Sequence, residues 1–271
     1  MFLARPFGVA ALGFVVVLVA ATIGAPLTGV DPLQITDRVL RPPSASAFLG
    51  TDELGRDILV GILYGARVSL AVGLLAALFA TVFGTLVGSM AGYYGGFLDT
   101  AVMRTSELFQ VLPTFILAAV IVALSGPGLV QVVGVISVLA WPQTARLIRG
   151  EVLRVKEMEY VYAVRCLGYS ESVILAREVI PNAITPTLAL GTLIVGQAML
   201  LEAGLSFLGL SNPDVMSWGR MLNSGQRFLS NAWWLSFFPG CAILVTVLAF
   251  NLLGDAVNSA LDPKQVKAAK R

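Results

Sequence analysis

The sequence predicts an all-α membrane protein with six transmembrane helices and both termini in the cytoplasm. Of its 271 residues, 57% are hydrophobic and only 13% are charged, whereas a soluble domain carries about 25% charged residues. Long windows contain no charge at all, and a helix needs about 20 apolar residues to cross a bilayer. Lysine and arginine are distributed unevenly between the segments that join these windows, which sets the orientation.

The first charge-free window lies between Arg5 and Asp31. Its apolar run, at about 7–27, is longer than the h-region of a typical signal peptide, which has about 7–15 residues. We therefore expect a retained first transmembrane helix.

A polar interval, 31–67, follows, so that residues 1–67 are expected to comprise the first transmembrane helix and an extracytoplasmic segment. The interval contains TDELGRD (51–57), in which charges of both signs alternate. We expect Asp52 to cap a helix that begins near Glu53 and leads into the second span.

The second span is expected at about 68–92, where small residues are frequent. Gly84 and Gly88 form a small-xxx-small pair, which lets two helices approach closely, although glycine is also simply common in membrane helices. The sequence YYGG (93–96) predicts an interfacial turn with aromatic side chains at the headgroup level.

The next charge-free window is too long for one span, and SGPG (125–128) near its middle predicts a tight turn between two helices. We expect the third span at about 101–124 and the fourth at about 129–148. Pro113 and Pro142 lie inside these spans and are expected to kink them, because proline removes a backbone donor.

A charged loop is predicted at 150–182, between the fourth and fifth spans. Gly168 is expected to separate two short helices in it, because glycine readily adopts the positive φ that follows a helix end. Ser170 should cap the second helix, which is expected to run to about Ile180 and to end at Pro181. From these residues alone, the loop could equally be an inert, solvated connection.

The fifth span is expected at about 183–207 and the sixth at about 235–257, joined by a semi-polar loop, 208–234. Residues 68–263 would then form the transmembrane core. The basic residues of 264–271 would form a cytoplasmic tail in contact with lipid headgroups.

Several kinds of chemistry are excluded by residue types that the sequence lacks. It contains no histidine, which excludes histidine-dependent triads and metal sites, and no Gly-Lys pair, which excludes a P-loop for ATP. Cys166 and Cys241 are too few for a metal cluster. We expect no catalytic, cofactor or metal-binding residues in this chain. Glu202, inside the fifth span, is expected to form an ion pair with Arg220 or Arg227 and is a candidate gate residue.

The distribution of positive charge predicts the orientation. With the N-terminus inside, twelve of the eighteen lysine and arginine residues lie on the cytoplasmic side. The loop 150–182 is then cytoplasmic. A six-helix protein with no energy source of its own and an ordered cytoplasmic loop suits docking of a motor partner.

Four motifs, taken in order, resemble the inner-membrane permease subunits of binding-protein-dependent ABC importers. The resemblance is to the C-type permease of the dipeptide, oligopeptide and nickel branch, and it covers most of the chain from about 49 to 263. The motifs are LGTDELGRDIL (49–59) with YGARVSL (64–70), the loop pattern Ala163…Gly168…Ile180-Pro181-Asn182, LEAGLSFLGL (201–210) with SWGRML (217–222), and LAFNLLGDAVNSALDP (248–263).

The resemblance implies the type I ABC importer permease fold in the cytoplasmic membrane. It also implies a homologous second permease, two ABC ATPase subunits that bind ATP and magnesium, and an extracytoplasmic solute-binding protein that docks on 31–67 and 211–234. The lipid bilayer is the remaining partner, and the resemblance implies no binding of nucleic acid. The implied ATPase-coupling residues are Tyr162, Ala163, Val164, Arg165, Gly168, Ile180 and Pro181. The implied extracytoplasmic motif consists of Gly50, Thr51, Asp52, Gly55, Arg56 and Asp57.

The coupling loop departs from the family at one place. The family has Glu-Ala-Ala before the glycine, whereas this chain has Tyr162, Ala163 and Val164. Glu159, about one turn earlier, could replace the missing glutamate.

The resemblance predicts uptake of dipeptides or oligopeptides. Nickel complexes, haem or another small solute handled by the same branch remain alternatives. A self-contained secondary carrier or channel is the alternative from another class.

Overall fold

The computed structural model describes residues 6–25, 31–32, 34–212 and 215–261, and every regular element in them is a helix. The six predicted spans each fall on a long helix or a bent helix pair. These are α1 (Pro6–Gly24), α2 (Ile58–Tyr94), α3 (Gly96–Val111) with α4 (Thr114–Ser125), α5 (Leu129–Val155), α9 (Thr185–Phe207) and α11 (Trp234–Leu261).

Not all of these helices could cross a membrane by length and composition alone. Among the described residues, α2, α9 and α11 are long and apolar enough, and the bent pair α3–α4 makes a fourth candidate. The apolar part of α1, Gly8–Gly24, is shorter, and the second half of α5 carries charges. The count of six spans therefore stays a prediction.

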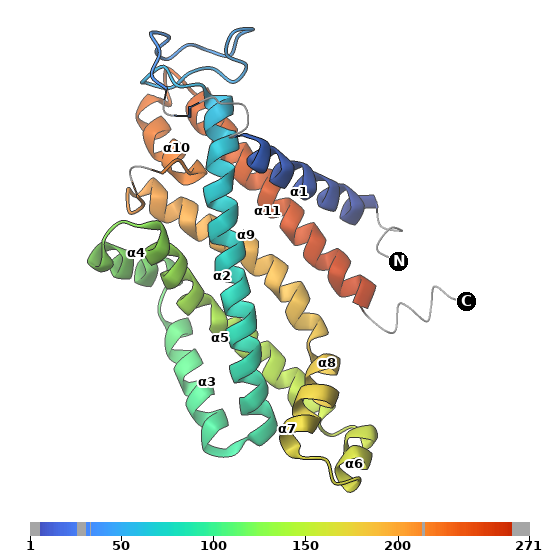
Figure 1. Ribbon diagram of the computed structural model, residues 1–271. Helices are drawn as coiled ribbons and strands as arrows, with labels where there is room; N and C mark the ends of the chain where they lie inside the picture. Colours follow the sequence, from blue (N-terminus) through green and yellow to red (C-terminus); the bar gives the residue numbers. More distant parts are fainter. Residues whose placement is uncertain (1–5, 26–30, 33, 213–214, 262–271) are drawn as a thin grey trace.

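Helix α2 extends from one end of the molecule to the other (Figure 1). Its 37 residues correspond to about 55 Å, longer than the roughly 30 Å apolar core of a bilayer. At one end lie residues 34–57, part of the predicted extracytoplasmic segment, which we call the outer segment, and helix α10 (Trp218–Gly225) with the 3₁₀ turn Gln226–Phe228. At the opposite end lie the short helices that connect α5 to α9. Helix α1 packs along α11.

The predicted close approach of helices at Gly84 and Gly88 is confirmed. A Cβ atom on Gly84 would lie 2.6 Å from Cβ of Thr144, and one on Gly88 would overlap the carbonyl of Ala145. Both contacts are to α5, so glycine allows α2 and α5 to pack with their backbones nearly touching.

The start of α2 differs from the prediction. Asp57, not Asp52, is its N-cap, and the Asp57 carboxylate accepts hydrogen bonds from the backbone of Leu59 (2.8 Å) and Val60 (3.3 Å). No helix begins near Glu53, because the backbone at Gly55 has φ +75°, which is not a helical conformation.

The two prolines act differently. The third span breaks at Pro113 into α3 and α4, which meet at 89°. Helix α5 continues through Pro142.

The predicted turn at 125–128 is confirmed, with φ +89° at Gly126. The turn predicted at YYGG is confirmed as well, with φ +68° and +61° at Gly95 and Gly96.

The end of the first span near 27 and the tail 264–271 lie outside the described residues.

Candidate functional site

The loop 150–182 has the predicted form of two short helices around a glycine. These are α6 (Glu159–Cys166) and α7 (Glu171–Ile174). Gly168 has φ +85°, and a Cβ atom there would meet no atom within 4 Å. The backbone conformation rather than lack of space therefore requires glycine. Ser170 is at the N-cap of α7, but its side chain makes no capping hydrogen bond.

The helix does not end at Pro181 as expected. It continues through a π-helical turn, Leu175–Val179, into α8 (Ile180–Ala183). Proline lacks an N–H and crowds the carbonyl four residues earlier, and the wider π turn before Pro181 accommodates both defects. The carbonyl of Glu178 accepts hydrogen bonds from the amide of Asn182 (2.6 Å) and the hydroxyl of Tyr160 (3.2 Å). The second hydrogen bond ties α6 to this turn.

An apolar cluster lies under the loop and attaches it to α5 and to the end of α2. Val161, Ile174 and Val179 are fully buried. They belong to one cluster with Val152 of α5 and Tyr93 of α2. The loop is thus packed on the transmembrane helices and is not a solvated connection.

Polar contacts close the loop across Gly168. Arg165 Nε donates to Glu171 Oε1 at 3.0 Å, and the hydroxyl of Tyr93 donates to the other oxygen of the same carboxylate. These hydrogen bonds, first from Tyr93 and then from Arg165, lower the pKa of the Glu171 carboxyl. One carboxylate therefore joins α6, α7 and the end of α2.

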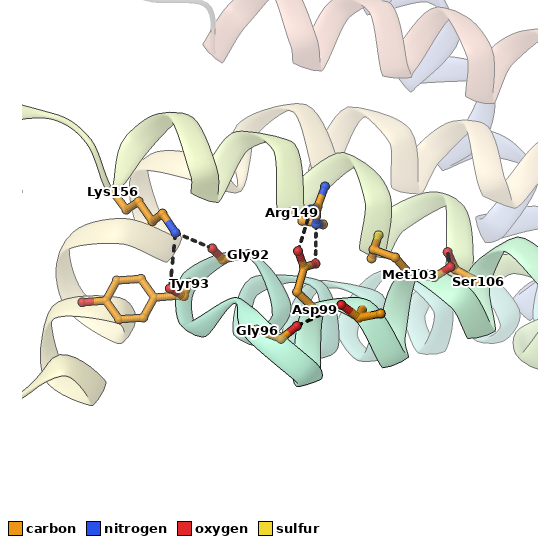
Figure 2. Close-up of polar contacts among 9 residues, drawn as sticks. Gly92, Tyr93, Gly96, Asp99, Met103, Ser106, Arg149 and Lys156 are labelled. Carbon is orange, nitrogen blue, oxygen red and sulfur yellow. Dashed lines mark hydrogen bonds and ion pairs between the residues drawn. The ribbon is translucent and has the colours of Figure 1, made fainter.

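Two further contacts fix the ends of α2, α3 and α5 to one another (Figure 2). Lys156 Nζ donates to the carbonyls of Gly92 (2.9 Å) and Tyr93 (3.4 Å), where a cation suits the negative end of the helix dipole. Arg149 and Asp99 form an ion pair with two hydrogen bonds. The sequence did not predict these pairs. The two residues of each pair lie 50 or more positions apart, and no local sequence pattern indicates which distant residues will meet.

The tip of the loop exposes large side chains. Tyr162 is 45% exposed, Leu167 76% and Tyr169 53%. Ala163 is exposed as well, and Val164 is half-buried. We call Tyr162, Leu167 and Tyr169 the tip patch. These exposed side chains are available for contact with another protein surface.

Tyr162 stands where the family resemblance implies glutamate. Its side chain binds a nearby carboxylate group by a hydrogen bond. Its hydroxyl donates to Glu157, and the Arg165 guanidinium lies 5.6 Å from the centre of its ring. The acidic group beside Tyr162 is therefore that of Glu157 and not that of Glu159.

The outer motif forms a tight turn against the rest of the outer segment. Gly50 has φ +86°, and a Cβ atom there would lie 2.7 Å from the carbonyl of Arg41. The Asp52 carboxylate accepts from the backbone of Leu54 (2.9 Å) and Arg56 (2.7 Å). Burial, the largest effect, raises the pKa of the Asp52 carboxyl.

Thr51 links this turn to its surroundings. It accepts from the backbone of Arg41 (2.9 Å) through its hydroxyl, donates to the carbonyl of Arg38, and accepts from Trp234 Nε1 (3.2 Å) through its own carbonyl. Asp52, Arg56 and Asp57 line a shallow hollow with Arg220 of α10. The motif and α10 therefore form one surface.

Glu202 lies where α2, α9 and α10 meet and is only 2% exposed. Ser206 donates to it at 2.6 Å and Ser69 at 3.4 Å. The Ser69 hydroxyl also accepts from the backbone of Trp218, which is fully buried. The expected ion pair with Arg220 does not form: among the described residues Glu202 contacts hydroxyls, while Arg220 donates to the carbonyl of Val215 (3.3 Å). Ser69 and Ser206 are small enough to enclose the carboxylate where the helices are close.

Comparison with protein families identifies the family of the chain. Residues 84–267 match the family described as "Binding-protein-dependent transport system inner membrane component". The chain belongs to this family. It is thus a multi-pass permease component of the inner membrane, as the four motifs indicated.

Curated relatives resemble the chain over most of its length. The dipeptide transport system permease protein DppC of Bacillus subtilis is 40% identical over 225 residues, which is 82% of this chain and 70% of the relative. The di/tripeptide permease DppC of Pseudomonas aeruginosa is 38% identical over 265 residues, 94% and 88% of the two chains. The glutathione transport permease GsiD of Pectobacterium atrosepticum is 38% identical over 229 residues, 84% and 76%.

A solved structure supports the fold. An inward-facing crystal form of the MetNI methionine ABC transporter superimposes with a TM-score of 0.63 at 19% identity, covering 76% of this chain and 98% of the other. The type I ABC importer permease fold implied by the family resemblance is confirmed.

Proposed function

We propose that the chain is one of two pore-forming permease subunits of an ATP-driven importer of dipeptides or oligopeptides. Relatives that transport dipeptides, tripeptides and glutathione support the substrate class. Two ATPase subunits bind ATP and magnesium, since this chain has no P-loop. A solute-binding protein delivers the peptide.

The anchored loop with its exposed tip patch carries this proposal. Tyr162, Leu167 and Tyr169 would enter a groove on one ATPase subunit, and the loop 150–182 would move with that subunit. Because the apolar cluster and the Glu171 contacts join the loop to α2 and α5, its motion reaches the transmembrane helices. ATP acts by favouring one of two arrangements of the whole complex.

The opposite end would face the binding protein. The distribution of positive charge supports a loop on the inside and an outer segment on the outside, with six spans and both termini cytoplasmic. The outer motif, 50–57, and α10 form a joined surface at that end. We propose that this surface receives the binding protein, with Glu202 and its serines holding the helices beneath it.

Reconstitution tests the proposal. The permease is combined in liposomes with the second permease, the ATPases and the binding protein from the same genome, and ATP-dependent uptake of a labelled dipeptide is measured. We expect uptake that requires every one of these components and that excess unlabelled tripeptide inhibits. Uptake of a nickel complex or haem without uptake of any peptide would overturn the substrate class. Peptide uptake by this chain alone would overturn the permease mechanism.

A further inference from the structure

Two glutamines lie exposed in the middle of long helices. Gln143 is in α5 and Gln197 is in α9, and both side chains are exposed. Along its helix Gln143 is about 21 Å from the start of α5, and Gln197 about 18 Å from the start of α9. In a bilayer with an apolar core of roughly 30 Å, both lie at membrane depth.

An amide that faces lipid at this depth is costly, because no hydrogen-bond partner is available there. Neither glutamine side chain makes a hydrogen bond to another described residue. A protein surface or a water-filled path must therefore supply the partner.

Both glutamines line the same hollow. It has a volume of about 410 Å³ and lies between α4, α5 and α9. Apart from Gln143, Gln197 and Thr114 its lining is apolar, and it includes no charged residue.

The broken helix pair lies beside this hollow. Thr114 and Phe115 of α4 line it directly after the break at Pro113, and Leu112 is 50% exposed. Non-helical backbone at membrane depth is found only where it is buried in protein or lines a water-filled cavity. The break is thus a second observation that indicates water on this side.

The other exposed side of α5 has the opposite character. A hollow between α2 and α5 is lined by leucine, valine and phenylalanine side chains. Its single hydroxyl, of Ser137, donates to the carbonyl of Val133 in its own helix at 2.7 Å. This face offers nothing to a polar molecule and suits lipid.

We propose that the hollow between α4, α5 and α9 is this chain's half of the translocation path, and that Gln143 and Gln197 hydrogen-bond the backbone of the passing peptide. A side-chain amide both donates and accepts, as a peptide group does. An uncharged lining admits peptides whatever the charge of their side chains. The contact with peptide rests on the proposed function.

Cysteine accessibility tests the path in the assembled complex. Cys166→Ser and Cys241→Ala remove the native thiols, and Gln143→Cys, Gln197→Cys or Val138→Cys introduces one. Val138 is the matched control, because it is on α5, 45% exposed, and lines the apolar hollow. We expect a membrane-impermeant thiosulfonate reagent to modify Gln143→Cys and Gln197→Cys with or without trapped ATP, and not Val138→Cys. Failure to modify either site in both states would mean that this face packs against the partner permease and would overturn the proposal.

Uptake kinetics test the contact with peptide. Gln143→Leu and Gln197→Leu keep the side-chain size but lose the hydrogen bonds, so we expect KM for dipeptide to rise about five- to tenfold for each. An unchanged KM would overturn the contact. Absence of peptide uptake in the wild-type complex would refute the proposed substrate, whereas thiol labelling would still report on the path.

Discussion

Arg149 of α5 and Asp99 of α3 are joined by two hydrogen bonds, Nε to Oδ1 at 2.5 Å and Nη2 to Oδ2 at 2.6 Å. A planar guanidinium matches both carboxylate oxygens, which lysine cannot do. The pair holds α5 against the first turn of α3, directly after the Gly95–Gly96 turn (Figure 2).

Arg149→Lys should therefore destabilise the protein by about 1 kcal/mol, since the pair retains some solvent access. The measurement is thermal unfolding of the purified complex. Arg154→Lys is the control, because Arg154 pairs with Glu151 on the same helix and is more exposed. Equal losses in both variants would contradict a special role for Arg149.

Gly168→Val should leave the protein inserted but uncouple transport from ATP hydrolysis. A β-branched residue at φ +85° costs at least about 1–2 kcal/mol, so α6 and α7 would change their relative direction. Substrate-stimulated ATP hydrolysis is the readout. Gly150→Val is the control, because Gly150 lies within α5 with open space around it. Wild-type stimulation in Gly168→Val would refute the role of the loop.

Glu171→Gln should weaken coupling, since it removes the charge that Arg165 and Tyr93 share. The pKa of this carboxyl is lowered, so its stabilising contribution is present above the ordinary glutamate pKa and is lost only as the pH falls through the lower folded value. Wild-type coupling should accordingly be constant from about pH 8 to about pH 6. Glu107→Gln, which breaks an exposed pair on α3, is the control. A loss of coupling near neutral pH would contradict this assignment.

Glu157→Gln should reduce binding of the ATPase subunit more than Glu159→Gln does. Of these two glutamates, Glu157 accepts a hydrogen bond from the hydroxyl of Tyr162, the residue that stands where the family resemblance implies glutamate. Affinity between the purified permease complex and the ATPase gives the comparison. The reverse order would identify Glu159 as the replacement for the missing glutamate.

Glu202→Gln should keep most of the stability, because an amide can accept from Ser206 and Ser69. Glu202→Leu should cost about 1–3 kcal/mol, since it leaves those buried hydroxyls without their acceptor. Combining Glu202→Gln with Arg220→Gln should give additive losses in thermal unfolding. A coupling energy between Glu202 and Arg220 larger than the experimental error would instead support the ion pair that the sequence predicted.

Helix positions were predictable to within a few residues where charge-free windows were long, as for α9, expected at about 183–207 and found at Thr185–Phe207. The roles of Gly168, Gly84 and Gly88 were also predictable from short stretches of sequence. Gly168 follows a helix end and needs a positive φ, and the pair Gly84 and Gly88 is spaced for close helix packing. The N-cap of α2 was misplaced by five residues, since Asp52 and Asp57 are both acceptable caps and only the turn at Gly55 selects one. Pro181 was wrongly expected to end its helix, because a π turn cannot be read from local propensity.

The sequence by itself determined the membrane class and the family, since each depends on composition or on short contiguous motifs, and it predicted the orientation from the distribution of positive charge. Only the tertiary structure decided which residues meet. Glu202 meets serines and not arginine, Tyr162 meets Glu157, and Gln143 shares a hollow with Gln197. Such contacts depend on the distances and rotations between helices, and these are set by packing across the whole bundle rather than by any local stretch of chain. Gly168 needed only its own φ to be predicted, whereas its effect on transport depends on every contact that anchors the loop around it.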